Sequence, residues 1–261
     1  MRRLNNQPSR GWTRQAIRIW GLLFLAAGAA GQGIVMNVLM GMKGLSGAEV
    51  LEVLEASERN MTLAVVALLS QMAYACAIPI YTFLLVDGFR RTKNIRNYLL
   101  RLAGVALLAE IPYNLAMSGV WLDFNSRNPM VALVLSAVML YIFTSYSGWK
   151  FKNVMIRLLV LAVSIIWIEM LRIDHGVAVM ILTCTQWGLR KNRSWQILGG
   201  CAMMFVVSAF PAYNPTYWLA PIVFLAVHFY NDEQGEENRW MNYLSYPVLL
   251  LAVGLIAKFA F

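Results

Sequence analysis

Two apolar stretches joined by a basic turn constrain this chain more than any other feature. They occupy residues 80–114, IYTFLLVDGFRRTKNIRNYLLRLAGVALLAEIPYN, and the second stretch, which begins at Tyr98, carries a carboxylate twelve residues later at Glu110. An α-helix rises about 1.5 Å per residue, so Glu110 is expected well inside a lipid bilayer rather than at its edge. A carboxylate at that depth costs several kcal/mol unless it has a partner or faces water. The pattern therefore predicts a membrane protein with polar chemistry inside it.

The composition excludes an ordinary soluble domain, because hydrophobic residues make up 59% of the 261 residues and charged residues only 13%. The net charge of +9 is distributed in short clusters between apolar stretches, which orients helices and attracts anionic lipid headgroups. We therefore expect the lipid bilayer as a partner and, without a nucleic-acid-binding motif, no nucleic acid. Three cysteines lie in apolar stretches without a CxxC pair, so we expect core packing and no metal site: Cys76, Cys184 and Cys201.

Nine apolar stretches of about the length needed to cross a bilayer follow one another along the chain. The first is too long for a signal-peptide core and no small-residue cleavage site follows it, so we expect it to remain as a helix. The sequence predicts an all-α, polytopic transmembrane helix bundle that forms one integral membrane domain over residues 1–261. The expected spans are residues 19–41, 62–86, 98–117, 129–147, 155–171, 173–189, 196–212, 215–230 and 240–260.

The basic residues indicate how the chain is oriented. If every stretch crosses once, one side of the membrane carries Arg2, Arg3, Arg10, Arg14, Arg18, Arg90, Arg91, Lys93, Arg96, Arg101, Lys150, Lys152, Arg157, Arg190, Lys191, Arg193 and Arg239. The other side keeps only Lys43, Arg59, Arg127, Arg172 and Lys258. The positive-inside rule then predicts a short basic cytoplasmic N-terminus at residues 1–18 and an outer C-terminus. We expect a multi-pass protein of a cell membrane, either a bacterial inner membrane or a plasma membrane.

The longest outer segment, residues 43–61, combines valines and leucines with four glutamates. This pattern is typical of an acidic amphipathic helix on the outer surface. Ser46 followed three residues later by Glu49 predicts a capping box at its start. The segment is either a solvated connector or a cover over a site that faces outward.

Several polar residues are expected in the outer half of the membrane. Glu110 and Asn114 are four residues apart and share a helix face, Asn128 opens the next span, and Asp174 and His175 form an outer turn. If these residues converge, a carboxylate beside an imidazole provides general acid–base chemistry near neutral pH. The alternatives are a Glu110 that only bonds a neighbouring helix and an ordinary interfacial His175.

The basic turn at the inner side is a second candidate site. Arginine side chains and loop amides there have the chemistry to bind the phosphates of an anionic cofactor. The alternative is that these cations only orient the helices, as basic inner loops do in most membrane proteins. The turn contains Asp87, Gly88, Arg90, Arg91, Thr92, Lys93 and Arg96.

The stretch IPIYTFLLVDGFRRTKNIRNYLLRLAGVALLAEIPYNLA resembles the most characteristic part of the TraX family, whose namesake is the membrane N-acetylase of conjugative pilin. The matching positions are Pro79, Asp87, Gly88, Phe89, Thr92, Asn94, Tyr98, Arg101, Glu110, Ile111 and Pro112. Weaker similarity extends the resemblance from about residue 71 onward. It includes Asn128, Asp174, Gly176, Tyr230, Asn231, Gly235, Tyr246 and Pro247.

The chain departs from the family pattern at two places. Family members usually carry an Asp-His pair in the first span, where Gly31 and Gln32 stand here, and a histidine after the final Tyr-Pro, where Leu249 stands. If the first-span histidine is the family's catalytic base, this chain has lost it unless His175 replaces it from the opposite side of the pocket.

The resemblance implies a membrane-embedded acyltransferase that moves an acetyl group from cytoplasmic acetyl-CoA to a secreted peptide, pilin or glycan at the outer face. It implies acetyl-CoA binding by Arg90, Arg91, Thr92, Lys93, Asn94 and Arg101. The acceptor would contact Tyr113, Asn114 and Asn128, and His175, Asp174 and Glu110 would be catalytic. Two alternatives remain: a non-catalytic partner or scaffold for a secreted peptide or export system, and a transporter, although the sequence lacks the inverted halves of many transporters.

Overall fold

The computed structural model describes residues 11–209, 214–235 and 239–259, and within these ranges the chain is helical, with no β-strand. The basic residues Arg2, Arg3 and Arg10 lie outside the described residues, as do residues 210–212 and 260 of two expected spans. The elements are α1 (Arg14–Ala30), the π-helical η1 (Gly31–Leu39), α2 (Gly47–Glu55), α3 (Glu58–Arg91), α4 (Ile95–Ser118), α5 (Met130–Ser145), α6 (Phe151–Met170), α7 (Gly176–Leu189), α8 (Arg193–Ala209), the 3₁₀-helical η2 (Pro215–Val223), α9 (Phe224–His228) and α10 (Arg239–Phe259).

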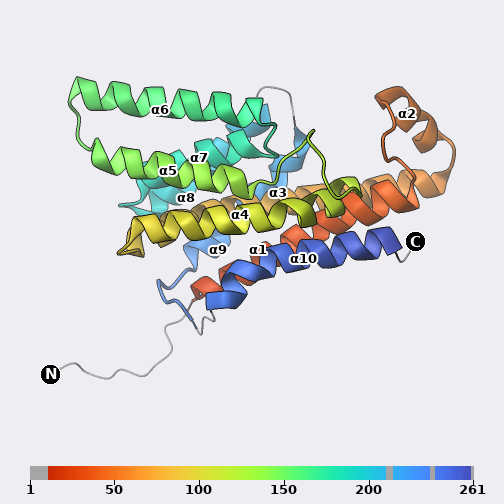
Figure 1. Ribbon diagram of the computed structural model, residues 1–261, viewed down its shortest axis with the longest axis horizontal. Helices are drawn as coiled ribbons and strands as arrows, with labels where there is room; N and C mark the ends of the chain where they lie inside the picture. The colour runs from red at the N-terminus through yellow and green to blue at the C-terminus, as the bar shows by residue number, and fades with distance from the viewer. Residues whose placement is uncertain (1–10, 210–213, 236–238, 260–261) are drawn as a thin grey trace.

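All nine expected spans contain helix within the described residues, which confirms an all-α bundle. Five helices are long and apolar enough to cross a membrane: Arg14–Leu39, Glu58–Arg91, Ile95–Ser118, Phe151–Met170 and Met241–Phe259. The other four expected spans contain the shorter helices α5, α7, α8 and η2 with α9. The helices run roughly along the longest axis of the molecule (Figure 1).

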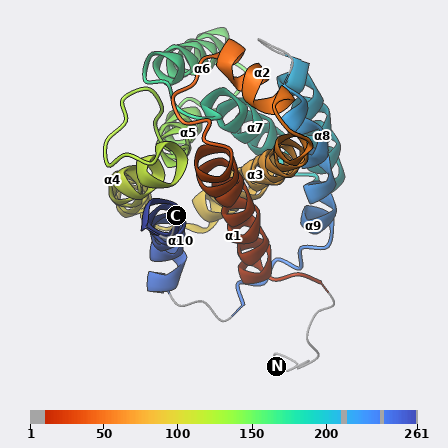
Figure 2. The ribbon, with the colours of Figure 1, turned by 90° about the vertical axis from the view of Figure 1, so that its right-hand side faces the viewer.

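Helix α3 is the central element of the bundle, with α1 beside it and η2 and α7 on its other sides (Figure 2). It is buried almost without interruption from Tyr74 to Phe89, as expected for a helix that neighbours surround. Pro79 interrupts its backbone hydrogen bonding, and the Thr82 hydroxyl donates to the carbonyl oxygens of Ile78 (3.0 Å) and Pro79 (3.1 Å). Pro79 has no N–H to donate to the Ala75 carbonyl, whereas the buried Thr82 hydroxyl is paired within its own helix.

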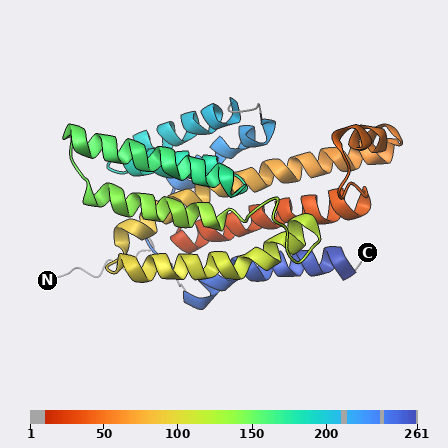
Figure 3. The same cartoon turned by 45° about the horizontal axis from the view of Figure 1, so that its top comes forward.

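Helices α1 and η1 approach their neighbours closely through small residues. A Cβ atom on Gly28 would lie 2.2 Å from the Cβ of Tyr74, and one on Gly33 would lie 2.3 Å from the carbonyl oxygen of Ala116. Only glycine permits these contacts, and small residues at helix interfaces are how membrane helices pack tightly. Helix α10 lies along α4 (Figure 3).

Two short backbone bridges fix the loops at the two ends of the bundle. At the end where α1 begins, the Trp12 amide donates to the Phe229 carbonyl (2.8 Å) and Asn231 donates back to Trp12 (3.0 Å). We call this the basic end, since the arginine-rich α3–α4 turn also lies there, together with the α5–α6 turn (Figure 1). Nearer the other end, Arg127 pairs with residues 172–174 through two backbone hydrogen bonds of 3.0 Å. The loops that carry the predicted site residues are thus tied together.

The predicted amphipathic segment forms α2 and the first turn of α3 at the end opposite the basic end (Figure 1). The capping box is confirmed, because the Ser46 amide donates to Glu49 Oε2 at 2.7 Å. The Ser46 hydroxyl donates to the same oxygen, and these bonds hold the pKa of Glu49 below its ordinary value. Leu51 is exposed on this helix.

Candidate functional site

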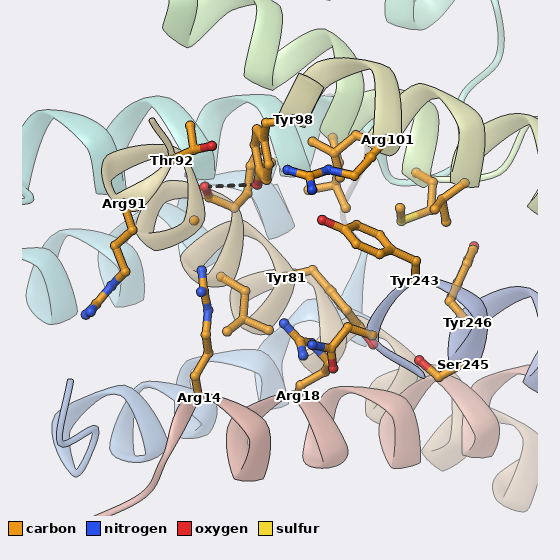
Figure 4. Close-up of a pocket in the computed structure, with 18 of the residues that line it drawn as sticks. Arg14, Arg18, Tyr81, Arg91, Thr92, Tyr98, Arg101, Tyr243, Ser245 and Tyr246 are labelled. Carbon is orange, nitrogen blue, oxygen red and sulfur yellow. Dashed lines mark hydrogen bonds between the residues drawn. The ribbon is translucent and has the colours of Figure 1, made fainter. Parts of the chain in front are cut away.

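A cavity of about 440 Å³ opens between α1, the end of α3, α4 and α10 at the basic end (Figure 4). We call it the basic cavity. Five cationic side chains line it, and none of the described residues that line it is acidic, which makes it suited to an anionic ligand. The polar lining includes Arg14, Arg18, Arg91, Lys93, Arg101, Thr92, Tyr81, Tyr98, Tyr243 and Tyr246.

The cations reach the cavity from three helices. Arg14 and Arg18 are four residues apart on α1 and therefore share a face, while Arg101 extends from α4 toward Tyr243 of α10 (Figure 4). The Arg101 guanidinium carbon lies 5.7 Å from the centre of the Tyr243 ring. An arginine beside an aromatic ring offers both charge and a flat apolar face.

Asp87 organises the edge of this cavity. It is buried, and Arg91 Nε donates to both of its carboxylate oxygens at 2.9 and 3.0 Å. The Tyr230 hydroxyl donates at 3.1 Å, and Arg14 Nη2 lies 3.5 Å away. Arg91 also pairs with Asp232 at 3.2 Å, and in Figure 4 its side chain extends away from Arg18 and Arg101. Its charge is therefore mainly satisfied by carboxylates of the chain itself.

Of the six residues predicted to bind acetyl-CoA, four line the basic cavity: Arg91, Thr92, Lys93 and Arg101. Arg90 is exposed and does not line it. Asn94 caps α4 instead, where its side chain accepts from the Asn97 amide at 3.0 Å. Arg14, Arg18 and Tyr243 were not singled out from the sequence, although the four-residue spacing of the two arginines indicates a shared face.

Glu110 is held by two partners in the loop between α4 and α5. Arg127 Nη1 lies 3.1 Å from Glu110 Oε1, and Asn128 Nδ2 donates to Oε2. Asn128 also donates to the Ala106 carbonyl at 3.0 Å and accepts from the Met130 amide at 3.0 Å. These contacts satisfy a carboxylate whose side chain is only 18% exposed and fix the start of α5.

His175 caps the beginning of α7 in a left-handed backbone conformation, with φ of 52°. Such a conformation costs of order 1–3 kcal/mol in a residue other than glycine and is concentrated at functional sites. The Tyr217 hydroxyl lies 2.5 Å from His175 Nδ1, and the Tyr74 ring packs 5.2 Å from the imidazole. Tyr217 was missed from the sequence because it lies 42 residues away in the chain.

Asp174 lies beside His175, but its carboxylate forms its shortest hydrogen bond with a different residue. Asp174 Oδ1 is 3.6 Å from His175 Nε2, an ion-pair distance. Asp174 Oδ2 accepts from the Tyr113 hydroxyl at 2.9 Å. The structure thus brings Tyr113, Asp174 and His175 together, whereas no hydrogen bond or ion pair joins Glu110 to His175 within the described residues.

Asn114 occupies an unusual position on α4. It is 1% exposed, and neither its amide nitrogen nor its amide oxygen has a hydrogen-bond partner within the described residues. Leaving buried polar atoms unpaired costs about 1–3 kcal/mol for each group. Both amide groups of Asn114 therefore have hydrogen-bonding capacity that no described residue uses.

A small void of about 30 Å³ lies next to His175. Four of its lining residues, Tyr81, Met130, Leu133 and Tyr246, also line the basic cavity. The two spaces are therefore neighbours, and together they extend from the arginines to the imidazole. The other lining residues are Leu25, Tyr74, Ala77, Ile78, Pro129, His175 and Val179.

Helix α3 runs along both spaces, so its length gives the distance from the basic cavity to His175. Arg91 lines the basic cavity and Tyr74 touches His175, and their separation of seventeen positions corresponds to about 25 Å of helix. Tyr81 lies between them, seven residues or two turns from Tyr74 on the same face. A ligand that contacts both ends must be long and thin.

The family model described as TraX protein matches residues 71–257, more than two thirds of the chain. The chain belongs to the TraX family. No curated protein and no solved structure matches it. Together with the five apolar helices of spanning length, TraX membership makes this a membrane protein. The matched region includes α3 from residue 71, α4 with Glu110, and the turn that carries His175.

The two first-span positions at which this TraX protein departs from the family pattern are neutral in the structure. Gly31 packs so closely on α3 that a Cβ atom would lie 2.3 Å from the Cβ of Ser70. Gln32 Oε1 accepts from Gln71 Nε2 at 3.1 Å. Neither residue supplies a base. The imidazole that lines the void is that of His175.

Proposed function

We propose that this TraX protein transfers an acetyl group from cytoplasmic acetyl-CoA to an acceptor at the outer face of the membrane, either a peptide N-terminus, such as that of a pilin, or a glycan. The observation that carries this proposal is the line of two neighbouring spaces, one rimmed by cations and the other by His175. The first suits the phosphates of a nucleotide-type donor, and the second is where a general base meets the acyl group.

The proposal uses nine membrane spans with the N-terminus inside. In that topology the α3–α4, α5–α6 and α7–α8 turns share the cytoplasmic side, and half of the 22 lysines and arginines lie in or beside them. The basic cavity then opens toward the cytoplasm and the Arg127–Asp174 loops face outward. Helix α5, with 16 residues, is about 24 Å long, so the shorter spans imply a locally thin bilayer.

The donor fits the basic cavity by charge and shape. Arg14, Arg18 and Arg101 supply guanidinium groups for the phosphates, and Tyr243 offers a flat face for the adenine. The phosphopantetheine arm then follows α3 past Tyr81, so the thioester reaches His175.

In the transfer step, His175 Nε2 accepts the proton of the acceptor amine or hydroxyl as its nitrogen or oxygen attacks the thioester carbonyl carbon. A carbon–nitrogen or carbon–oxygen bond forms, the carbon–sulfur bond breaks, and the CoA thiolate takes the proton back from the imidazolium. Asp174, 3.6 Å away, stabilises the imidazolium, and Tyr217 holds the ring through Nδ1. Glu110 orients Asn128 at the rim of the site.

Calorimetry on detergent-purified, full-length protein tests the donor site. Acetyl-CoA should bind saturably, and Arg18→Ala combined with Arg101→Ala should weaken binding at least about tenfold, because two charge-assisted contacts are lost. Arg90→Ala removes one guanidinium at the same end, outside the cavity, and should leave the affinity unchanged. His175→Ala should keep acetyl-CoA binding and abolish acyl transfer. Absence of saturable binding at millimolar acetyl-CoA, in folded wild-type protein, would refute the proposal.

A second candidate function is a non-catalytic membrane partner for a secreted peptide or an export system. The neutral Gly31 and Gln32, where the family pattern carries an ionisable pair, favour it. Under this function the arginine pair affects abundance or topology but no ligand affinity. The comparison of Arg18→Ala/Arg101→Ala with Arg90→Ala therefore separates the two functions.

A further inference from the structure

The void beside His175 has an apolar wall, and two of the tyrosines that form it carry buried hydroxyl groups without a partner. Tyr74 is 2% exposed and Tyr246 is 5% exposed, and neither hydroxyl has a hydrogen-bond partner within the described residues. Both side chains line the void. The surface of the void itself is nearly all apolar, so each hydroxyl must turn toward the void before it can donate to a ligand there. Buried hydroxyls are normally paired, and a ligand atom that accepts hydrogen bonds would provide the missing partner.

The size of the void limits what enters it. A space that admits one water molecule needs about 10–15 Å³ on the same measure, so the void's 30 Å³ has room for roughly two small groups of atoms. Met130, Leu133 and Val179 form part of the apolar wall. The void therefore matches a carbonyl oxygen with one short alkyl group.

We propose that this void is the acyl pocket, in which the hydroxyls of Tyr74 and Tyr246 donate hydrogen bonds to the thioester carbonyl oxygen and Leu133 and Met130 restrict the acyl group to about two carbons. This inference rests on the proposed function, because it needs an acyl-CoA in the basic cavity. It adds the residues that hold the acyl group and determine its length.

The residues shared by the two spaces determine the direction from which an acyl group enters the void. Leu133, Met130 and Tyr246 line both spaces, so an arm that arrives from the basic cavity passes them before it reaches His175. A longer acyl chain must displace these side chains from a packed core. One additional methylene in such a pocket typically changes discrimination by 10–200-fold.

The test compares the dissociation constants of CoA, acetyl-CoA and butyryl-CoA, measured by calorimetry on full-length protein in detergent. Acetyl-CoA should bind at least about tenfold more tightly than butyryl-CoA. Acetyl-CoA should also bind more tightly than CoA, because only the thioester carbonyl accepts hydrogen bonds from the two tyrosines.

Two matched pairs of variants locate the effect. Leu133→Ala enlarges the void and should bring butyryl-CoA to within about threefold of acetyl-CoA. Leu102→Ala removes the same atoms from a wall of the basic cavity alone, so it can weaken all three ligands together but leaves their ratio unchanged. Tyr246→Phe should erase the preference for acetyl-CoA over CoA, whereas Tyr98→Phe, in the basic cavity alone, should preserve it.

The outcomes separate this inference from the proposed function. If no CoA compound binds the wild type, the proposed function itself fails and the acyl pocket with it. If all three ligands bind but acetyl-CoA and butyryl-CoA bind equally, only the acyl pocket is refuted. Equal shifts of the affinity ratio in Leu133→Ala and Leu102→Ala would also refute it, because the selectivity would not arise at the void.

Discussion

Replacing Gly28 by alanine tests whether α1 and α3 touch as closely as the structure indicates. The added Cβ would lie 2.2 Å from the Cβ of Tyr74 and 2.6 Å from its ring. Because the Tyr74 Cβ is anchored to the backbone of α3, a rotamer change cannot relieve the contact. The two helices must separate, and the displaced Tyr74 ring moves relative to His175, which it contacts at 5.2 Å between ring centres.

Two opposing contributions determine the expected change in the free energy of unfolding. Overpacking a tight interface costs typically about 1–3 kcal/mol, and replacing glycine by alanine within a helix stabilises by roughly 1 kcal/mol. Gly104 of α4 provides the matched control, because a Cβ there meets nothing within 4 Å. Gly104→Ala should therefore gain only the stabilisation that alanine brings to a helix, without the overpacking cost. The two variants should then differ in unfolding free energy by about 1–3 kcal/mol.

Thermal unfolding in detergent, followed by tryptophan fluorescence, measures this difference. A change of 1 kcal/mol shifts the melting temperature by roughly 2–4 °C in a chain of this size range. Gly28→Ala should accordingly melt about 2–12 °C below Gly104→Ala. Equal melting temperatures for the two variants would show that α1 does not pack on Tyr74 and would remove the basis for placing Tyr74 against His175.

Three further outcomes are expected from local contacts. Asn128→Ala leaves Glu110 without one of its partners and should lower the unfolding free energy by about 1–3 kcal/mol, measured by thermal unfolding. The hydrogen bond from the Ser118 hydroxyl holds the pKa of Asp123 below its ordinary value; this bond therefore stabilises the fold above the ordinary Asp pKa of about 3.9. The stabilisation disappears as pH falls through the lowered pKa, so Ser118→Ala should destabilise at neutral pH and have no effect in strong acid. Ser46→Ala removes the N-cap of α2, worth about 1 kcal/mol, and should speed proteolysis within that helix.

The features that the sequence predicted correctly depend on neighbouring residues. Apolar length and composition predicted the helices, and the three-residue spacing of Ser46 and Glu49 predicted the capping box that the structure contains. The basic turn is also a local signal, and two of its residues, Thr92 and Lys93, line the basic cavity.

Contacts between distant helices could not be read in this way. Tyr217 reaches His175 across 42 residues, and Tyr98 and Tyr246 share a cavity only because α4 and α10 pack together. Tyr74 and Tyr81 could be assigned to one helix face from their seven-residue spacing, but the sequence does not indicate which neighbour that face meets.

Several of the buried polar side-chain atoms that lack a hydrogen-bond partner lie where the acyl transfer is proposed. At the basic end, buried Asp87 has an arginine, a tyrosine and a second nearby arginine as partners, and Glu110 is likewise paired. Seven described residues carry buried polar side-chain atoms without a partner, and three of them, Tyr74, Tyr81 and Tyr246, line the single void that His175 also lines. His175 itself holds a left-handed backbone conformation. Since natural sequences tolerate such local conflicts mainly at functional sites, the void favours a working acyl site over a lapsed one, despite the neutral residues at positions 31 and 32.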